Sequence, residues 1–165
     1  MINTTVQEAI NEQIKNELYS AYLYLAMSAH FEAANLPGFA RWTRLQSDEE
    51  VAHAMKLFDY LNDRGGRVEL HGIDKPPKTW RSTLAAAEQV LEHEQKVTGL
   101  IHKLYETALK ENDYATQVML QWFIDEQVEE EKNASQIVEQ LKMIEDRGTA
   151  ILYLDKQLGK RSEEE

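Results

Sequence analysis

Glu50 and His53 lie three residues apart in the stretch SDEEVAH, residues 47–53. A carboxylate and an imidazole are both common metal ligands. In an α-helix, residues three apart project from the same face, so both side chains can reach one ion. Because the chain contains 29 Asp and Glu residues, a single Glu-x-x-His pair is weak evidence for a metal site. The interpretation therefore depends on the residues that accompany this pair.

The spacing around this pair occurs twice in the chain. A Glu stands 33 residues before Glu50, and an offset of 77 residues converts the whole set into a second one with the same separations. The two sets are Glu17, Glu50 and His53 in the first half, and Glu94, Gln127 and Glu130 in the second. The same offset carries Glu49 to Glu126. One helical hairpin used twice would bring both sets to a pseudo-two-fold axis in the centre of the molecule.

All six residues are in phase with apolar stripes. Glu17 lies between Ile14 and Ala21, and Glu50 precedes Ala54 by about one helical turn. Glutamates at such positions are expected to face the core, where an unpaired carboxylate is costly unless it is protonated or binds a cation. The set is rich in oxygen and has one imidazole. It therefore favours iron or manganese over structural zinc, which more often uses Cys or several His ligands.

Four long helices and a short fifth one are expected to position these residues. Apolar residues at helical spacing predict helices over roughly 5–34, 38–65, 82–110, 114–145 and 149–159. Gly and Pro concentrate in a crossover over roughly 66–81. Short loops make each sequential pair antiparallel, whereas the crossover is long enough to run the length of a bundle. We therefore predict one all-α domain, residues 1–165, which forms a four-helix bundle with one long crossover and a short fifth C-terminal helix.

Composition disfavours several classes of protein. The chain has no Cys, which excludes disulfides and thiolate metal sites and fits a reducing, cytoplasmic location. The net charge of −11 disfavours a nucleic acid partner and favours cations. No apolar run approaches the roughly 18 residues of a membrane span, so no membrane partner is expected.

The other histidines and the fifth helix have simpler interpretations. His30, His71, His93 and His102 are expected at the surface or at an interface, since His93 faces about 100° away from Glu94 on a helix. The fifth helix is apolar for a short segment, and we expect it to pack against copies of itself.

Five segments carry a resemblance that covers nearly the whole chain: NEQIKNELYSAYLYLAM, DEEVAHAMKLFDYLNDRGGRV, KPP, LEHEQKVTGLIHKL and QWFIDEQVEEE. In these segments the sequence resembles the ferritins, specifically the bacterial and archaeal non-haem type. The resemblance implies a ferritin-like bundle and a homo-oligomeric shell of 24 subunits. It also implies one iron held by Glu17, Glu50 and His53, and a second held by Glu94 and Glu130, with Glu50 bridging the two.

The resemblance places further residues around the two irons. Gln127 would be a hydrogen-bonding neighbour in the inner shell. Tyr24 would lie beside the centre and supply an electron, with Trp122 as a weaker candidate for that role. A third iron site would use the carboxylates of Glu49, Glu126, Glu129 and Glu130.

Two features separate the chain from related families. A bacterioferritin would have a second Glu-x-x-His where this chain has Gln127 and Glu130, and a haem-binding Met where it has Ala52. Rubrerythrins add a Cys-rich iron domain, which a chain without Cys cannot form. No haem is therefore expected.

The resemblance implies iron storage with ferroxidase activity. Fe(II) would be oxidised to Fe(III) by dioxygen or peroxide, and the product would be kept as a ferric oxyhydroxide mineral inside the shell. Two alternatives remain open at this point. One is a rubrerythrin-like dimetal peroxidase without storage, and the other is a structural helical bundle whose inward glutamates are protonated or hydrated.

Overall fold

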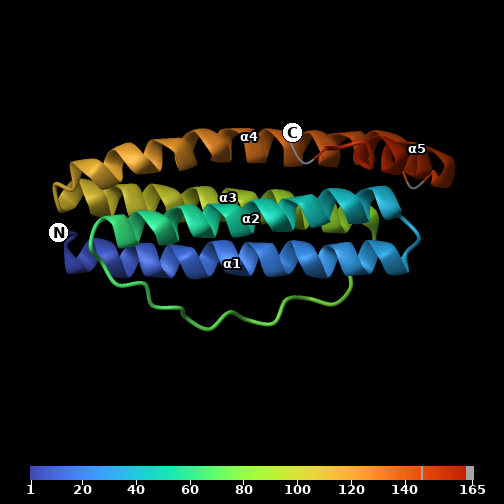
Figure 1. Ribbon diagram of the computed structural model, residues 1–165. Coiled ribbons are helices and arrows are strands. Elements are labelled where there is room, and N and C mark those ends of the chain that lie inside the picture. The colour runs from blue at the N-terminus through green and yellow to red at the C-terminus, as the bar shows by residue number, and fades with distance from the viewer. Residues whose placement is uncertain (146, 163–165) are drawn as a thin grey trace.

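The computed structural model describes residues 1–145 and 147–162. Its helices are α1 (Thr4–Ala33), α2 (Pro37–Asp63), α3 (Thr83–Lys110), α4 (Tyr114–Ile144) and α5 (Gly148–Leu158). Helices α1 to α4 form an elongated bundle, and α5 lies across one end of it (Figure 1). The predicted all-α four-helix bundle with a short fifth helix is confirmed. In the described part of the chain, every helix is too short or too polar to cross a membrane.

Side-chain caps and turn residues set the ends of the long helices. Asn3, Ser82 and Asp113 accept hydrogen bonds from backbone N–H groups in the first turns of α1, α3 and α4. Asn35 and Asn112 adopt positive φ angles of 59° and 53°, each two residues after the end of its helix, α1 and α3 respectively. Asn tolerates this left-handed conformation better than most residues. The chain therefore reverses within a few residues, and α1–α2 and α3–α4 form antiparallel hairpins.

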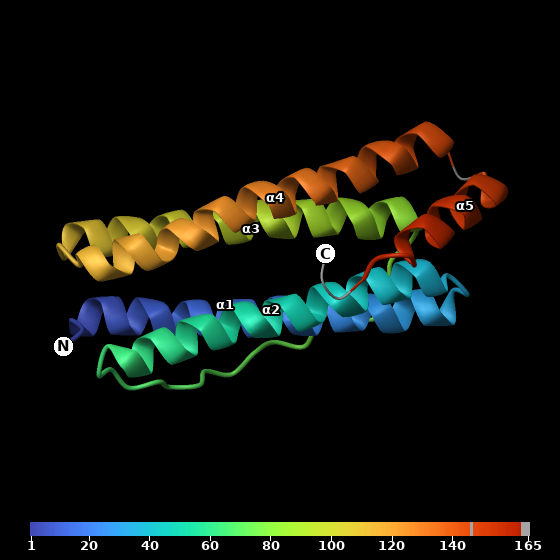
Figure 2. The same cartoon turned by 45° about the horizontal axis from the view of Figure 1, so that its top comes forward.

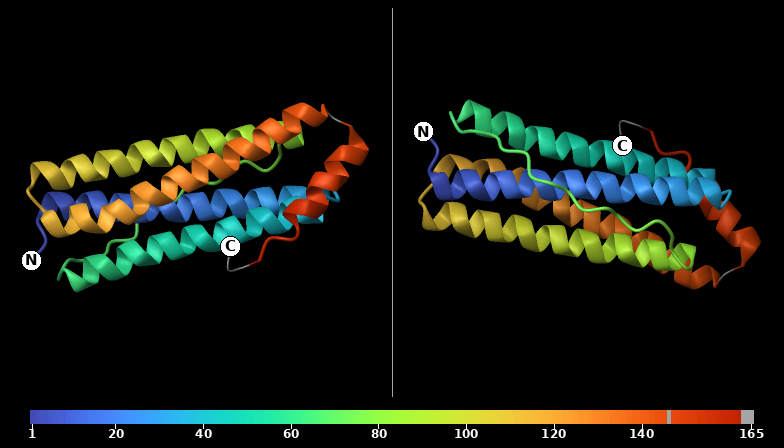
Figure 3. Two further views of the ribbon diagram at one scale, coloured as in Figure 1. Left: turned by 90° about the horizontal axis from the view of Figure 1, so that it is seen from above. Right: turned by 90° about the horizontal axis from the view of Figure 1, so that it is seen from below.

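The crossover between α2 and α3 runs along the outside of α1 for most of the length of the bundle (Figures 1 and 3). The Asn11 side chain donates to the Arg67 carbonyl at 3.0 Å and accepts from the Glu69 N–H at 3.0 Å. The Gln7 side chain accepts from the Arg67 N–H at 2.8 Å. These bonds fix the start of the crossover on α1. The segment then delivers the chain to the end where α2 began, so α3 runs parallel to α2.

Two apolar clusters make up the core. One lies toward the end covered by α5 and includes Phe31, Phe39 and Leu154. The other lies toward the opposite end and includes Ile10 and Leu61. Between the clusters, all four long helices contribute buried polar side chains: Glu17, Glu50, His53, Glu94, Gln127 and Glu130. The fold thus places one polar layer between two dry halves of the bundle.

A buried carboxylate docks α5 on the start of α2. Asp155 accepts a hydrogen bond from the Phe39 N–H at 2.8 Å and is 7% exposed. The N-terminus of α2 has no side-chain cap of its own, so Asp155 supplies the acceptor and the negative charge that such an end favours. Leu154 packs in the core, whereas Leu152 and Tyr153 are exposed. The expected packing of α5 against its own copies stays a prediction.

Candidate metal centre

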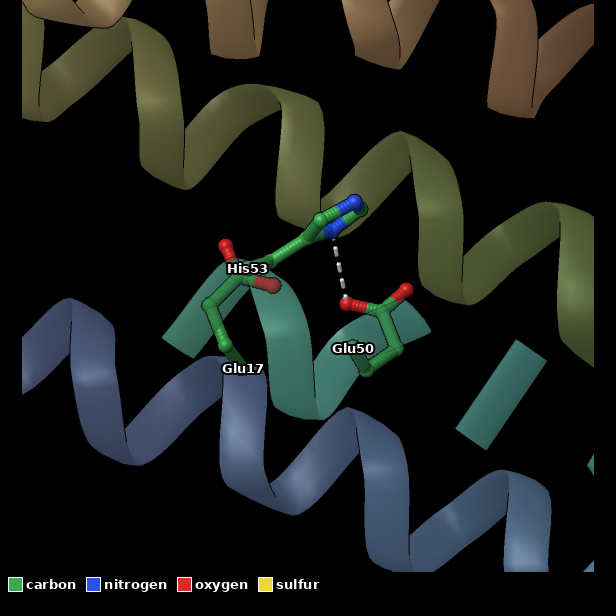
Figure 4. A group of neighbouring side chains, drawn as sticks. All are labelled: Glu17, Glu50 and His53. Atoms are coloured by element: carbon green, nitrogen blue, oxygen red, sulfur yellow. Dashed lines mark ion pairs between the residues drawn. The ribbon is translucent and has the colours of Figure 1, made fainter. Parts of the chain in front are cut away.

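Three residues of the first hairpin meet between α1 and α2. Figure 4 shows Glu17 reaching from α1 toward α2, where Glu50 and His53 lie one turn apart. One potential ligand atom from each lies within 4.8 Å of the others. His53 Nδ1 is 3.3 Å from Glu50 Oε2. This group is the only one of its kind among residues 1–145 and 147–162.

These carboxylates lack the partners that buried oxygens normally have. The Glu17 and Glu50 side chains are each 1% exposed, and one oxygen of each has no hydrogen-bond partner within the described chain. Buried polar atoms in proteins are nearly always hydrogen-bonded, so two open acceptors facing an imidazole need an explanation. A cation between them would satisfy both oxygens. The donor set therefore fits a metal ion.

The second hairpin contributes a matched set from α3 and α4. This set is Glu94, Gln127 and Glu130, which follow Glu17, Glu50 and His53 by 77 residues. All six side chains are buried. The Gln127 side-chain amide donates to Glu94 Oε2 at 3.2 Å and to the Glu94 carbonyl at 3.2 Å. The Tyr24 hydroxyl donates to Glu94 Oε1. Gln127 therefore acts as a donor to a carboxylate in this geometry.

Burial and mutual repulsion raise the pKa values of three glutamates in this layer, Glu50, Glu94 and Glu130. Burial raises the pKa of Glu50 well above its usual range, and the charges of Glu17 and Glu94 add to the shift. Burial raises the pKa of Glu94 to about 7. Burial, reinforced by the charge of Glu94, raises the pKa of Glu130 to about 8. Because charges from both hairpins act on Glu50, the two sets share one electrostatic environment.

Within the described residues, no Lys or Arg balances the charge of the layer, whose one imidazole is that of His53. Among the ion pairs of the described residues, none joins a Lys or Arg to Glu17, Glu50, Glu94 or Glu130. Desolvated carboxylates without a cationic partner hold protons or bind metal ions. The site is therefore built so that protons and cations compete for the same oxygens.

Two glutamines that support the layer were missed by sequence reasoning. The Gln13 amide donates to Glu17 Oε1 at 2.8 Å, and the Gln46 amide donates to Glu130 Oε2 at 2.8 Å. Both glutamines are buried. A local signal was available for Gln13, which stands four residues before Glu17 on the same helix face. Gln46 stands four residues before Glu50, but its contact is with Glu130 of another helix, which this spacing does not indicate.

Three further candidate residues, Glu49, Glu126 and Glu129, are referred to as the outer carboxylates. They lie beside this layer and are more open to solvent. Glu126 Oε1 is 3.9 Å from His53 Nε2, and Glu129 is exposed. Burial raises the pKa of Glu126, a shift that nearby His53 opposes and the charges of Glu129 and Glu49 reinforce. The three carboxylates thus interact through charge. Within the described ranges they form no group with ligand atoms as close as the inner three.

The two aromatic candidates have different surroundings. Tyr24 is fully buried, and burial followed by the charges of Glu94 and Glu50 raises its pKa well above the usual range. Its hydroxyl therefore stays protonated and keeps donating to Glu94. Trp122 is 38% exposed, and its ring centroid lies 5.3 Å from that of His53. Both lie beside the centre, and their electron-donor roles stay predictions.

His93, expected at the surface or at an interface, lies between α1 and α3. It is half-buried, and its Nε2 is 2.7 Å from Ser20 Oγ. Its ring lies edge-on to Tyr24, with centroids 6.4 Å apart. Burial, with the charge of Lys96, lowers the pKa of His93 to about 4, so the ring is neutral near pH 7. The imidazole thus packs against Ser20 and Tyr24 of α1.

Comparison with known proteins gives a consistent result over the whole chain. The sequence family described as Ferritin-like domain matches residues 7–144. The bacterial non-heme ferritin of Bacteroides fragilis is 45% identical over 161 residues, which cover 98% of this chain and 100% of that protein. The bacterial non-heme ferritin of Staphylococcus haemolyticus is 38% identical over 165 residues, covering 100% of this chain and 99% of that protein.

A solved structure agrees at the level of the fold. The open pore ferritin from the hyperthermophilic archaeon Archaeoglobus fulgidus superposes with a TM-score of 0.97 and is 50% identical, covering 98% of this chain and 100% of that one. Sequence and structure are therefore similar over essentially the same length. The chain belongs to the ferritin family, among its non-haem members.

Proposed function

We propose that the protein oxidises Fe(II) to Fe(III) at the buried centre and stores the product as a ferric oxyhydroxide mineral inside a hollow homo-oligomeric shell. One observation carries the proposal: a desolvated layer of glutamates from four helices, without a Lys or Arg partner among the described residues. Carboxylate oxygens together with one imidazole are suitable ligands for both Fe(II) and Fe(III). Membership of the ferritin family supports the storage role.

Two Fe(II) ions are the substrates of this centre. We assign one to Glu17, Glu50 and His53, supported by their close ligand atoms and open carboxylate oxygens. We assign the other to Glu94 and Glu130, with Glu50 shared. The charges of Glu17 and Glu94 both act on Glu50, which supports this bridging position. Gln127 keeps its hydrogen bond to Glu94 and orients that carboxylate.

The ligands favour the oxidised product. Each Fe(II) gives up one electron, and dioxygen takes up two electrons and two protons to leave as hydrogen peroxide. With peroxide as the oxidant, two electrons and two protons yield two waters. Anionic ligands in a desolvated site balance the charge of Fe(III) better than that of Fe(II). The glutamates with raised pKa values give up protons when cations bind.

The remaining candidates have supporting roles in the proposal. Tyr24 is the proposed source of an additional electron, since it lies next to the centre and donates its proton to a hydrogen bond with Glu94. A third iron would use the outer carboxylates Glu49, Glu126 and Glu129 together with Glu130. The shell would contain 24 copies of the chain and work in the cytoplasm, and the absence of Cys fits that compartment.

The ligand assignment is tested by removing one ligand at a time. Glu17→Ala and His53→Ala should lower the initial rate of Fe(II) oxidation under air, followed by absorbance, by about tenfold or more. Glu8→Ala and His102→Ala are matched controls, because they remove exposed residues of the same types from α1 and α3. An unchanged initial rate in either ligand variant would reject the proposed centre.

The storage function needs a separate measurement. Purified protein is loaded with Fe(II) in air, and iron per chain and particle mass are then measured together. Many irons per chain in a large particle support storage. A small oligomer that oxidises iron but retains only the ions of its centres would instead indicate a dimetal peroxidase.

A further inference from the structure

The segment after α5 returns along α2 toward the middle of the bundle (Figures 2 and 3). Arg161 lies in this segment, and its side chain is 14% exposed. Its Nη2 donates to Glu49 Oε2 at 2.7 Å, and its Nη1 donates to Gln46 Oε1. The guanidinium also lies 5.5 Å from the Trp42 ring centroid, and the Arg41 side chain donates to the Arg161 carbonyl at 3.2 Å. Arg161 is thus held at a defined position on α2.

Arg161 fixes the orientation of the Gln46 amide. A guanidinium has only donors, so the oxygen of the Gln46 amide must face Arg161. The NH2 group of Gln46 therefore faces Glu130 Oε2, to which it donates at 2.8 Å. Gln46 is 2% exposed, so bulk water does not replace Arg161 or Glu130 as the hydrogen-bond partner of its amide. Through one amide, Arg161 determines how one oxygen of Glu130 is held.

Arg161 also pairs directly with Glu49, one of the outer carboxylates. Of the seven candidate carboxylates, Glu49 is the only one that forms an ion pair with an Arg or Lys in the described structure. A cation that binds Glu49 must compete with the guanidinium for the same oxygen. The inner residues Glu17 and Glu50 have no such competitor among the described residues.

We infer that Arg161 is a positioning residue that weakens cation binding at the outer carboxylates relative to binding at the inner residues Glu17 and Glu50. It competes for Glu49 directly, and it restrains Glu130 through Gln46. Incoming iron therefore fills the inner sites first, and an ion at the outer carboxylates stays loosely held and can move on. This inference rests on the proposed function, because it concerns the order in which that centre is filled.

The experiment measures binding of a redox-inert ion. Zn(II) is titrated calorimetrically into the full-length, iron-free assembly for wild type, Arg161→Gln and Arg161→Lys. In Arg161→Gln, the weak class of sites should tighten by about tenfold, as expected when one competing ion-pair partner is removed. The tight class should change much less, because Glu130 is the one proposed inner ligand linked to Arg161, and that link runs only through Gln46. In Arg161→Lys, tightening should be smaller, about threefold, because Lys keeps the charge but cannot serve Glu49 and Gln46 together.

Arg44→Gln is the matched charge control. Arg44 is also on the surface of α2, but its side chain is 64% exposed and its ion-pair partner is Asp48. Removing it lowers the charge of the chain by the same amount without touching the centre, so both classes of site should bind as in wild type. Equal tightening in Arg44→Gln and Arg161→Gln would attribute the effect to net charge and overturn the inference.

A double-mutant cycle with Glu49→Gln tests direct competition. If Arg161 acts mainly through Glu49, the tightening caused by Arg161→Gln should shrink several-fold when Glu49 is already neutral. Full tightening in the Glu49→Gln background would contradict competition for that carboxylate. Thermal unfolding checks that each variant is folded. If Arg161→Gln does not assemble, Arg161→Lys provides the test by itself. Wild-type Zn(II) affinity at the weak class of sites in Arg161→Lys would then overturn the inference.

The outcomes separate the two proposals. If wild type binds no Zn(II) at the tight class, the proposed centre itself fails. If the tight class is filled normally and the weak class does not respond to substitution of Arg161, only the role of Arg161 fails.

Discussion

At the scale of single residues, a glutamate in the polar layer can bind either a proton or a metal ion. Glu50, Glu94 and Glu130 all have raised pKa values because burial disfavours their charged forms. The Gln13 amide donates to Glu17 and fixes its position. The Gln46 amide donates to Glu130, which fixes that carboxylate and favours its charged form. The same oxygens are thus poised to exchange a proton for a cation. Two consequences can be measured without oxidation chemistry.

Metal-free protein is expected to lose stability as pH rises from about 5 to about 8. The folded-state pKa values of Glu94, about 7, and Glu130, about 8, lie above the unfolded value of roughly 4.3. In this window the folded state binds more protons, so the free energy of unfolding falls with pH, by on the order of 3 kcal/mol for Glu94 alone. Urea unfolding of chelator-treated protein at several pH values measures this slope.

Two comparisons support that measurement. Glu50→Gln removes one of the buried titrating groups and should flatten the slope while stabilising the metal-free fold. Added Zn(II) should raise the melting temperature more at about pH 8 than at about pH 6, because protons no longer compete with the ion. Metal-free stability that rises over this pH range would contradict the assignment of neutral glutamates to the layer.

Glu129→Ala should separate the first oxidation from later turnover. Glu129 is exposed, so its removal leaves the inner layer and the fold intact. The first oxidation should keep its wild-type rate, whereas later rounds should slow or use a different amount of oxygen per iron. Stopped-flow absorbance and an oxygen electrode measure the two phases. Glu92→Ala, an exposed carboxylate on α3, is the control and should change neither.

At the scale of elements, two hairpins and a docked helix hold the layer in place. Each hairpin presents its polar residues between apolar turns, so the layer forms only when both hairpins pack together. Helix α5 then covers one end of the bundle, with Leu154 in the apolar cluster there. The segment that follows α5 carries Arg161 to α2. The position of α5 therefore influences a residue beside the metal centre.

Asp155→Ala should loosen α5. The substitution removes the buried acceptor for the Phe39 N–H and the negative charge at the start of α2. We expect a loss of about 1–2 kcal/mol in the free energy of unfolding, the usual cost of losing a helix cap and its charge. Limited proteolysis should cut within α5 before the bundle unfolds. Asp155→Asn keeps an acceptor oxygen, so its free energy of unfolding should lie between those of wild type and Asp155→Ala. Equal stability of wild type and both variants would contradict the docking role.

At the scale of the whole molecule, one bundle has no space for a mineral, so storage depends on assembly. The α4–α5 end exposes Met143, Leu152 and Tyr153, which are 76%, 58% and 67% exposed. Large apolar side chains gathered at one end of a chain are typical of contacts between subunits. They are candidates for contacts that close the proposed shell.

Replacing both Leu152 and Tyr153 by Glu should reduce the size of the assembly. Carboxylates cannot be buried in an apolar contact without a large cost, so contacts made by this face should be lost. Light scattering on a sizing column measures the mass. Lys156→Glu changes charge at an exposed position on the same helix and should leave the mass unchanged. If the double variant assembles like wild type, this face is not part of the shell.

The sequence by itself determined the helices and the candidate residues of the polar layer. Helical periodicity is a local property, and residues three or four apart share a face whatever surrounds them. The doubled spacing of 33 and 3 then made convergence of the two hairpins the simplest arrangement, and the structure places all six residues in one buried layer. Their assignment as iron ligands still rests on the experiments above.

Only the tertiary structure decided which distant residues support or restrain that layer. Gln46 reaches Glu130 across 84 residues, and Arg161 reaches Glu49 across 112. The half-buried position of His93 against Ser20 likewise depends on how α1 packs on α3. No local pattern encodes these contacts, because each depends on the angle and depth at which separate helices pack.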